Sequence, residues 1–468
     1  MKTMFTSCAA ALLLATAASG ASAQILIGQS ADLSGPVAAS VKETILGSQL
    51  VIDQVNAQGG INGEQIEVIR LDDGLDAKRS LENTRILIED KKVVALLLNR
   101  GTPNTIAVIP LLDKYGVALV GPSTGAMALH KPLQKNIFNV RSTYQREAEK
   151  AVQHLQTTGI QRIAVVQADD SCGKDALEGA NKGFEKANLK PAVIALADRN
   201  KPDYSVIVPQ STKANAQAVL WIGSGTAVTE GVKALRAAGS AAQIITLSNN
   251  AASGFIKELS SASAGVIITQ VLPYERSFGH PLIKEALALA KAKGQNDLSP
   301  ALLEGFVATK VMVEALRRTG PKPTRARLIA TLNNFQYDIG GGLDVSYSRR
   351  ITRASTTSTC RSSARAASSG NRRAAIYFYL GAAAAGAGSC VASPPCFSPD
   401  MSTLSPAFEI TNRARAAKMT RSRRRVSTWV LSPEWFKKKA SCRWHEAPLL
   451  NGGSAVAALL SNIRQSFA

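Results

Sequence analysis

The hydrophobic pattern from residue 24 to residue 348 alternates between short apolar runs and longer runs with helical periodicity. A first series has strands predicted at 25–27, 65–71, 93–97 and 117–120, and helices at 40–57, 77–89 and 105–115. A second series has helices predicted at 145–157, 173–187 and 228–238, and strands at 163–166, 218–222, 244–247 and 266–270. Strands that alternate with helices of about a dozen residues are typical of parallel sheets covered on both faces. The pattern therefore predicts an α/β fold with two doubly wound parallel-sheet lobes, and a long helical stretch over 281–332 packed on one of them.

The first 23 residues have the pattern of an export signal. Lys2 gives a positively charged start, residues 9–18 form an apolar core, and Ala21-Ser22-Ala23 is a small-residue cleavage site. The alternative is a buried N-terminal helix, for which an alanine-rich run with this ending is unusual. We therefore expect cleavage after Ala23 and a periplasmic mature protein.

Charge divides the chain near residue 348. The net charge is +21, but residues 349–468 alone hold 19 Lys and Arg against 4 Asp and Glu. The basic runs of this tail, at 421–425 and 437–439, are the basis for a nucleic-acid interpretation, and no recognisable nucleic-acid module surrounds them. We therefore predict no nucleic-acid partner. The 45% hydrophobic content of the whole chain is typical of a globular protein.

The sequence motifs of common enzymes are missing. The first strand leads into Gly28-Gln29-Ser30-Ala31-Asp32 rather than G-x-G-x-x-G, which argues against a nicotinamide-dependent dehydrogenase. No two histidines have the spacing of a metal-ligand pair, and the G-x-S-x-G elbow of serine hydrolases is absent. The sequence predicts no enzyme activity, no cofactor and no metal.

Small, hydroxyl-rich loops follow two neighbouring predicted strands. Residues 121–126 (Gly-Pro-Ser-Thr-Gly-Ala) come after one strand, and residues 99–105 (Asn-Arg-Gly-Thr-Pro-Asn-Thr) come after the other. Ligands of such sheets bind beyond the carboxyl ends of the strands, where hydroxyls and N–H groups at a helix start bind a carboxylate. Helix capping explains one such loop by itself, but two on successive strands favour a ligand site.

Three other segments carry a specific combination of residues. They are Leu33-Ser34-Gly35-Pro36-Val37-Ala38, the run 55–63 that ends in Gly59-Gly60-Ile61-Asn62-Gly63, and Leu71-Asp72-Asp73. Together they resemble the type I periplasmic binding proteins of branched-chain amino-acid (Leu/Ile/Val-type) ABC transporters, over residues 24–348. The resemblance implies two lobes joined by a three-segment hinge, with a branched-chain or related amino acid enclosed between them. It also implies a monomer that delivers this ligand to a membrane permease.

In lobe one the resemblance places the ligand on the two small loops. The hydroxyl of Thr102 is expected to bind a carboxylate oxygen. The backbone and hydroxyls of Ser123, Thr124 and Gly125 are expected to bind the carboxylate and amino groups. Arg100 puts a cation beside the first loop, and two alternatives stay open for it: a side chain that points into the site, or a solvated surface residue.

In lobe two the sequence departs from the family pattern. The two aromatic wall positions fall on Cys172 and Ser224, and the acidic position that neutralises an ammonium falls near Asn249. An amide cannot supply that charge, and a buried unpaired charge is expensive. The ligand is therefore either an amino acid, as the resemblance implies, or an aromatic or aliphatic carboxylic acid without an amino group. A ligand-sensing receptor domain of the same fold is a further alternative. Cys172 is expected to be a small wall residue rather than a reactive thiol.

The resemblance also predicts where the chain passes between the lobes. We expect crossings near 140–142 and 270–272, with a third in or beyond the tail. These crossings assign residues 24–141 and 272–348 to lobe one and 142–271 to lobe two, and the lobes are expected to close on the ligand.

The tail departs from the family at residue 349. The family continues there with a segment such as PTDHTGLDYVDLSIIG, whereas this chain reads Arg349-Arg350-Ile351-Thr352 and onward. Residues 350–364 can be encoded so that the same bases, read from one base earlier, give DHTGLDYVDLSIIG. We therefore predict a single-nucleotide deletion, in the gene or in its sequence, and a basic tail over 349–468 that is out of frame and is not a folded domain. The alternative is a genuine basic C-terminal domain.

Overall fold

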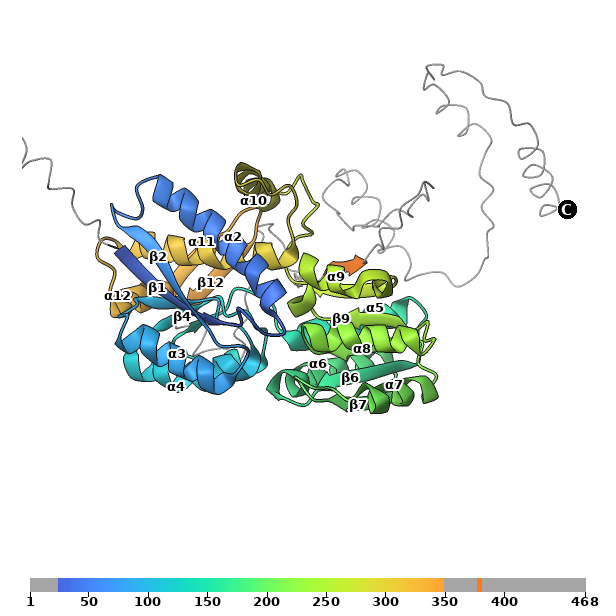
Figure 1. The fold of residues 1–468 in the computed structure, drawn as a ribbon. Helices are drawn as coiled ribbons and strands as arrows, with labels where there is room; N and C mark the ends of the chain where they lie inside the picture. Colours follow the sequence, from blue (N-terminus) through green and yellow to red (C-terminus); the bar gives the residue numbers. More distant parts are fainter. Residues whose placement is uncertain (1–23, 349–376, 381–468) are drawn as a thin grey trace, which may run out of the picture. The chain divides into compact units, whose positions relative to one another are not determined.

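The computed structural model describes residues 24–348 and the backbone of a strand at 377–380 (Figure 1). The first lobe is built on five parallel strands in the order β2-β1-β3-β4-β5. They are β1 (Gln24–Ala31), β2 (Gln65–Asp72), β3 (Ala95–Leu97), β4 (Ala118–Val120) and β5 (Ile137–Phe138), with helices α2 (Ala38–Ala57), α3 (Ala77–Glu89) and α4 (Thr102–Tyr115) between them. The strands and helices of the first predicted series are confirmed, with ends that move by a few residues.

The second lobe repeats this architecture with its own sheet. Its helices are α5 (Tyr144–Thr157), α6 (Ser171–Ala187), α7 (Tyr204–Lys213), α8 (Thr226–Ala237) and α9 (Ser253–Leu259). Its parallel strands are β6 (Ile163–Ala168), β7 (Val193–Ala197), β8 (Ala218–Ile222), β9 (Gln243–Thr246) and β10 (Val266–Gln270), in the order β10-β9-β8-β6-β7. Two sheets of parallel strands with helices between them confirm the predicted α/β class.

One short strand of the tail joins the second sheet. Strand β13 (Tyr377–Leu380) runs antiparallel to β10, with Tyr377 opposite Gln270 and Leu380 opposite Ile267. The sheet is therefore mixed rather than wholly parallel, because four residues of the tail pair with its edge strand. The rest of 349–468 lies outside the described residues, so the reading-frame hypothesis stays a prediction.

Two parts of the sequence-based assignment are corrected by the structure. Strands β5 and β7 and helices α7 and α9 were not predicted, and the single helical stretch over 281–332 is three helices. These are α10 (Pro281–Ala292), α11 (Pro300–Thr319) and α12 (Arg325–Leu332), followed by a hairpin of β11 (Asn334–Asp338) and β12 (Asp344–Ser348). The breaks fall at Gly294, with a φ of +76°, and at Gly320, with a φ of +81°. Glycine adopts this left-handed conformation readily, and a helix ends there.

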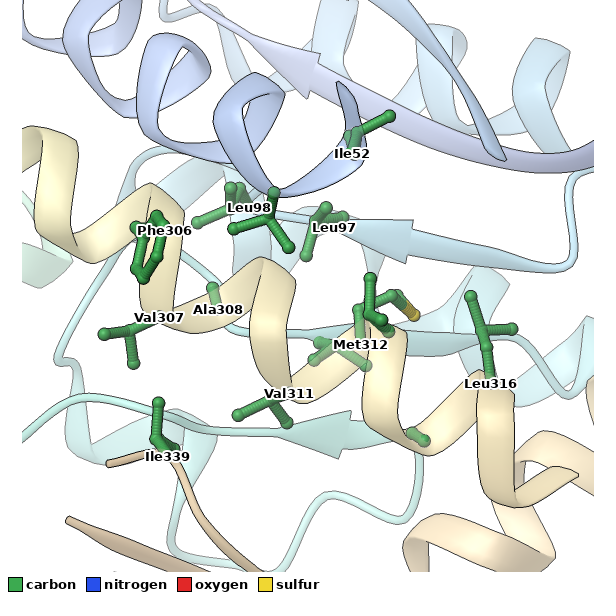
Figure 2. Packing of buried hydrophobic residues seen from close by; sticks show 14 of the residues in the cluster. Ile52, Leu97, Leu98, Phe306, Val307, Ala308, Val311, Met312, Leu316 and Ile339 are labelled. Atoms are coloured by element: carbon green, nitrogen blue, oxygen red, sulfur yellow. The ribbon is translucent and has the colours of Figure 1, made fainter. Parts of the chain in front are cut away.

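Helix α11 is the centre of the lobe-one core (Figure 2). Phe306, Val311 and Met312 on this helix are almost fully buried, and they belong to one cluster with Leu97 and Leu98 at the end of β3. The core therefore lies directly behind the loop that follows β3, which gives that loop a rigid support. None of the helices in the described part of the chain is both long and apolar enough to cross a membrane.

Helices α2 and α11 approach each other closely at two glycines. A Cβ atom on Gly47 would lie 1.8 Å from the carbonyl oxygen of Leu302, and one on Gly305 would lie 1.8 Å from that of Thr44. We expect Gly47→Ala and Gly305→Ala each to lower the free energy of unfolding by at least about 2 kcal/mol, because overpacking outweighs the gain in helix propensity. Urea denaturation measures this. Gly279→Ala is the control, because a Cβ there meets nothing within 4 Å.

Candidate ligand site

The two small loops of lobe one lie side by side at the carboxyl ends of β3 and β4. Arg100 and Ser123 form a parallel β-bridge, and the Ser123 amide donates to the carbonyl of Asn99 at 2.8 Å. Leu98 and Gly101 have φ values of +58° and +92°, so the backbone turns sharply on both sides of Arg100. The predicted neighbours on the two loops are therefore brought together.

A hydrogen bond between two hydroxyls links these loops. Thr102 Oγ1 and Thr124 Oγ1 are 2.6 Å apart, and both side chains are buried. Gly125 is also buried, and its carbonyl accepts from the amide of Tyr144 at 2.8 Å. A Cβ on Gly125 would lie 2.7 Å from the carbonyl oxygen of Ser142, so only glycine allows this approach. The loop after β4 is thus fixed against the start of α5.

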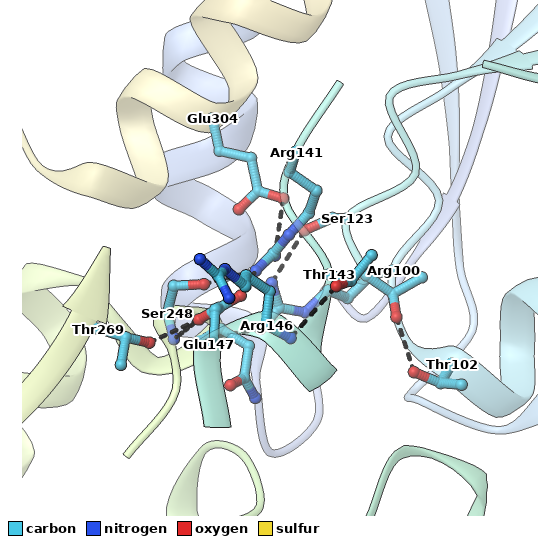
Figure 3. A network of polar contacts seen from close by, with 12 residues as sticks. Arg100, Thr102, Ser123, Arg141, Thr143, Arg146, Glu147, Ser248, Thr269 and Glu304 are labelled. Carbon is cyan, nitrogen blue, oxygen red and sulfur yellow. Dashed lines mark hydrogen bonds and ion pairs between the residues drawn. The ribbon is translucent and has the colours of Figure 1, made fainter. Parts of the chain in front are cut away.

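Arg100 is buried and points toward lobe two (Figure 3). Its Nη1 donates to Ser123 Oγ at 2.9 Å, and its Nη2 donates to the backbone carbonyl of Asn249 at 2.8 Å. Only 4% of the residue is exposed, so the alternative of a solvated surface residue is wrong. Arg100 belongs to none of the ion pairs found among the described residues. Its guanidinium is therefore a buried cation without a carboxylate partner in that part of the chain.

The lobe-two residues lie at the carboxyl ends of β6, β8 and β9. Asn249 donates through Nδ2 to the carbonyl of Gly223 at 2.9 Å, while its buried Oδ1 has no hydrogen-bond partner within the described segments. Cys172, in the first turn of α6, and Ser224, after β8, line one pocket of this lobe. Burial raises the pKa of Cys172 to about 11. A thiol with that pKa stays protonated at neutral pH. The protonated thiol is a weak nucleophile, which fits a wall residue better than a reactive thiol.

The sequence analysis missed two polar residues close to this site. Tyr144, at the start of α5, is buried, and burial raises its pKa to about 12, with Arg141 and Arg100 as nearby cations that lower it. Arg199, which follows β7, pairs with Asp170 and lines the same pocket as Cys172. A correct assignment of β7 would have placed Arg199 at a strand end, which is where ligand loops occur.

A second group of charges, also missed, lies where the chain passes from β5 to α5 (Figure 3). Arg141 donates to Glu147 of α5 at 2.9 Å and to Glu304 of α11 at 3.2 Å. The other oxygen of Glu147 accepts from the amide of Ser248 at 2.9 Å and from the hydroxyl of Thr269. Burial by itself lowers the pKa of Arg141. Nearby groups, Glu304 and Glu147 among them, raise that pKa by more than burial lowers it, so the net shift is upward. This group therefore ties both predicted crossings to helices of both lobes.

Comparisons with known proteins agree on one family. The family model described as periplasmic binding protein matches residues 24–398. A solved substrate-binding periplasmic protein from Ralstonia solanacearum is 33% identical, with 70% of this chain and 94% of that chain covered and a TM-score of 0.65. The leucine-, isoleucine-, valine-, threonine-, and alanine-binding protein of Pseudomonas aeruginosa is 24% identical over 68% of this chain and 84% of its own length. The Leu/Ile/Val-binding protein of Escherichia coli strain K12 is 23% identical over 61% of this chain and 77% of its own length.

Proposed function

We propose that this chain, which belongs to the periplasmic binding protein family, captures a small organic carboxylate that has no ammonium group. The family and the relative in Escherichia coli are described as binding proteins, and the class of ligand is what this proposal adds. We further propose that the mature protein begins after Ala23, acts as a monomer and passes its ligand to the membrane permease of an ABC importer. The single observation that carries the ligand class is Arg100, a buried guanidinium that faces the opposite lobe and has no carboxylate partner among the described residues.

Charge balance supports a carboxylate without an ammonium group over an amino acid. A buried cation without a counter-ion is costly, and a monocarboxylate that binds between the lobes would neutralise Arg100. Ser123, Thr102 and Thr124 add hydroxyls for the remaining carboxylate lone pairs. A zwitterionic amino acid would bring its own ammonium into a site that already holds a cation. Asn249 offers that ammonium an amide rather than a charge.

The second candidate is a branched-chain amino acid. It is favoured by the relatives in Pseudomonas aeruginosa and Escherichia coli, whose names state that they bind leucine, isoleucine and valine. Those relatives are at most 24% identical, and the departures at Cys172, Ser224 and Asn249 fall on the residues expected to contact the ligand.

A matched ligand pair tests the proposal. Leucine and 4-methylpentanoate differ only by the α-ammonium group, so their affinities report directly on whether the site accepts or rejects it. We expect isothermal titration calorimetry to show 4-methylpentanoate binding at least about tenfold more tightly than leucine, which corresponds to about 1.4 kcal/mol. Phenylalanine and 3-phenylpropanoate provide the same comparison for an aromatic ligand. Tighter binding of leucine than of 4-methylpentanoate would favour the second candidate instead.

A further inference from the structure

A pocket in lobe two is lined in part by the two small wall residues, Cys172 and Ser224. It lies at the carboxyl ends of β6, β7 and β8, and its lining includes Cys172, Ser224, Arg199, Asp170, Pro202 and Trp221. The family positions for aromatic walls hold a thiol and a hydroxymethyl group here, which are smaller than rings. The room left beside them suits a group of about the size of one water molecule.

This pocket adjoins the hydroxyls of lobe one. Cys172 is one of its walls, and the thiol of Cys172 also lies within hydrogen-bonding reach of Thr102. Thr102 in turn contacts Thr124 at 2.6 Å. A ligand whose carboxylate lies at Arg100 and these hydroxyls can extend past Cys172 into lobe two. The pocket would receive the end of the ligand that is far from its carboxylate.

Arg199 gives this pocket a specific chemistry. Its Nη1 is paired with Asp170, whose other oxygen caps α6 by accepting from the amide of Gly173 at 2.9 Å. The Nε–H of Arg199 is buried and finds no acceptor among the described residues. A buried donor without an acceptor costs stability that a suitable ligand atom restores. The pocket therefore offers one open hydrogen-bond donor beside an ion pair that is already neutral.

From this arrangement we propose that the ligand carries a neutral oxygen acceptor, a hydroxyl, carbonyl or ether, at the end remote from its carboxylate, and that Arg199 Nε–H donates to it. This inference rests on the proposed function. The charges decide against a second carboxylate, because Arg199 is already balanced by Asp170 and a monocarboxylate already balances Arg100. The ligand is thus an elongated hydroxy or oxo acid rather than a simple acid or a diacid.

The test uses three parent acids of different length, and compares each parent with its 4-hydroxy and 4-carboxy derivatives in the same assay. Benzoate, phenylacetate and 3-phenylpropanoate are titrated beside their 4-hydroxy and 4-carboxy counterparts, with the mature full-length protein and calorimetric detection. In the series that fits best, we expect the 4-hydroxy acid to bind about tenfold more tightly than the parent, as one hydrogen bond to a charged donor predicts. We expect the 4-carboxy acid to bind more weakly than the 4-hydroxy acid.

Two variants assign the effect to Arg199. Arg199→Lys keeps a cation opposite Asp170 but removes the Nε–H, so the preference for the hydroxyl should fall below about threefold. Arg236→Lys is the control, because Arg236 of α8 is an arginine of lobe two that donates to backbone carbonyls and does not line this pocket, and it should keep the full preference. Equal binding of the parent and hydroxy acids, tightest binding of the diacid, or an unchanged preference in Arg199→Lys would overturn this inference. The proposed function survives those results as long as the acids bind and leucine does not, and it fails separately if only leucine binds.

Discussion

Replacement of Arg100 by glutamine is expected to weaken binding of the carboxylate ligand by at least about 100-fold. Arg100 is 4% exposed, and its guanidinium supplies the only proposed counter-charge for the ligand. Loss of a charge-assisted hydrogen bond together with loss of the counter-ion for a desolvated carboxylate corresponds to about 3 kcal/mol. Calorimetric titration of the best-binding acid measures the change. The unfolding free energy of the ligand-free variant should not fall, because the substitution removes a buried charge that has no carboxylate partner among the described residues.

The control for this experiment is Arg236→Gln. Arg236 donates to the backbone carbonyls of Ser240 and Ala242, as Arg100 donates to that of Asn249, but it lies away from the carboxyl-end loops of lobe one. Its replacement should leave affinity unchanged within about twofold, which is less than about 0.5 kcal/mol. Wild-type affinity in Arg100→Gln would show that the guanidinium does not bind the ligand. A large loss of stability in the same variant would show that it has a structural role instead.

Strands that are buried on both faces of a sheet could be predicted from the sequence. Strands β3 and β4 consist of buried residues throughout, and their continuous apolar runs were assigned correctly. Strand β7 was missed because it is the edge of its sheet, where Ile194 and Leu196 are 41% and 58% exposed. Because these two large apolar residues face outward, the five-residue segment lacks the usual alternation of buried apolar and exposed polar residues. Pro209 inside α7 likewise hides a helix, because proline normally interrupts one.

The site could be predicted only where local sequence determines it. The hydroxyls of Thr102 and Thr124 lie on loops that the strand pattern places side by side, and the structure has them in contact. The burial of Arg100 depends on the carbonyl of Asn249, which is 149 positions away, and no local pattern reports such a contact. Arg199 was missed for the same reason as β7, because the strand that positions it was not recognised.

Replacement of Arg141 by methionine is expected to lower the free energy of unfolding by about 3–5 kcal/mol near neutral pH. The substitution keeps a long apolar side chain but leaves Glu147, which is fully buried, and Glu304, which is largely buried, without their cation. An unpaired buried carboxyl has a folded-state pKa above its unfolded value of about 4.3. The folded variant then binds protons more readily than the unfolded chain, so the penalty shrinks as pH falls toward that value and grows as pH rises. Urea denaturation over a pH series measures both effects.

Two further variants separate the loss of a buried ion group from a general effect of the substitution. Arg85→Met removes an arginine whose pair with Glu82 on α3 is exposed, and it should cost less than about 1 kcal/mol. Arg141→Met combined with Glu147→Gln removes one unpaired charge, so the double variant should be more stable than the sum of the two single changes predicts. The amide of Ser248 and the hydroxyl of Thr269 can still donate to the side-chain oxygen of the new amide in that variant. Strict additivity, or a penalty in Arg141→Met that does not depend on pH, would mean that Arg141 stabilises the crossings through packing rather than through charge.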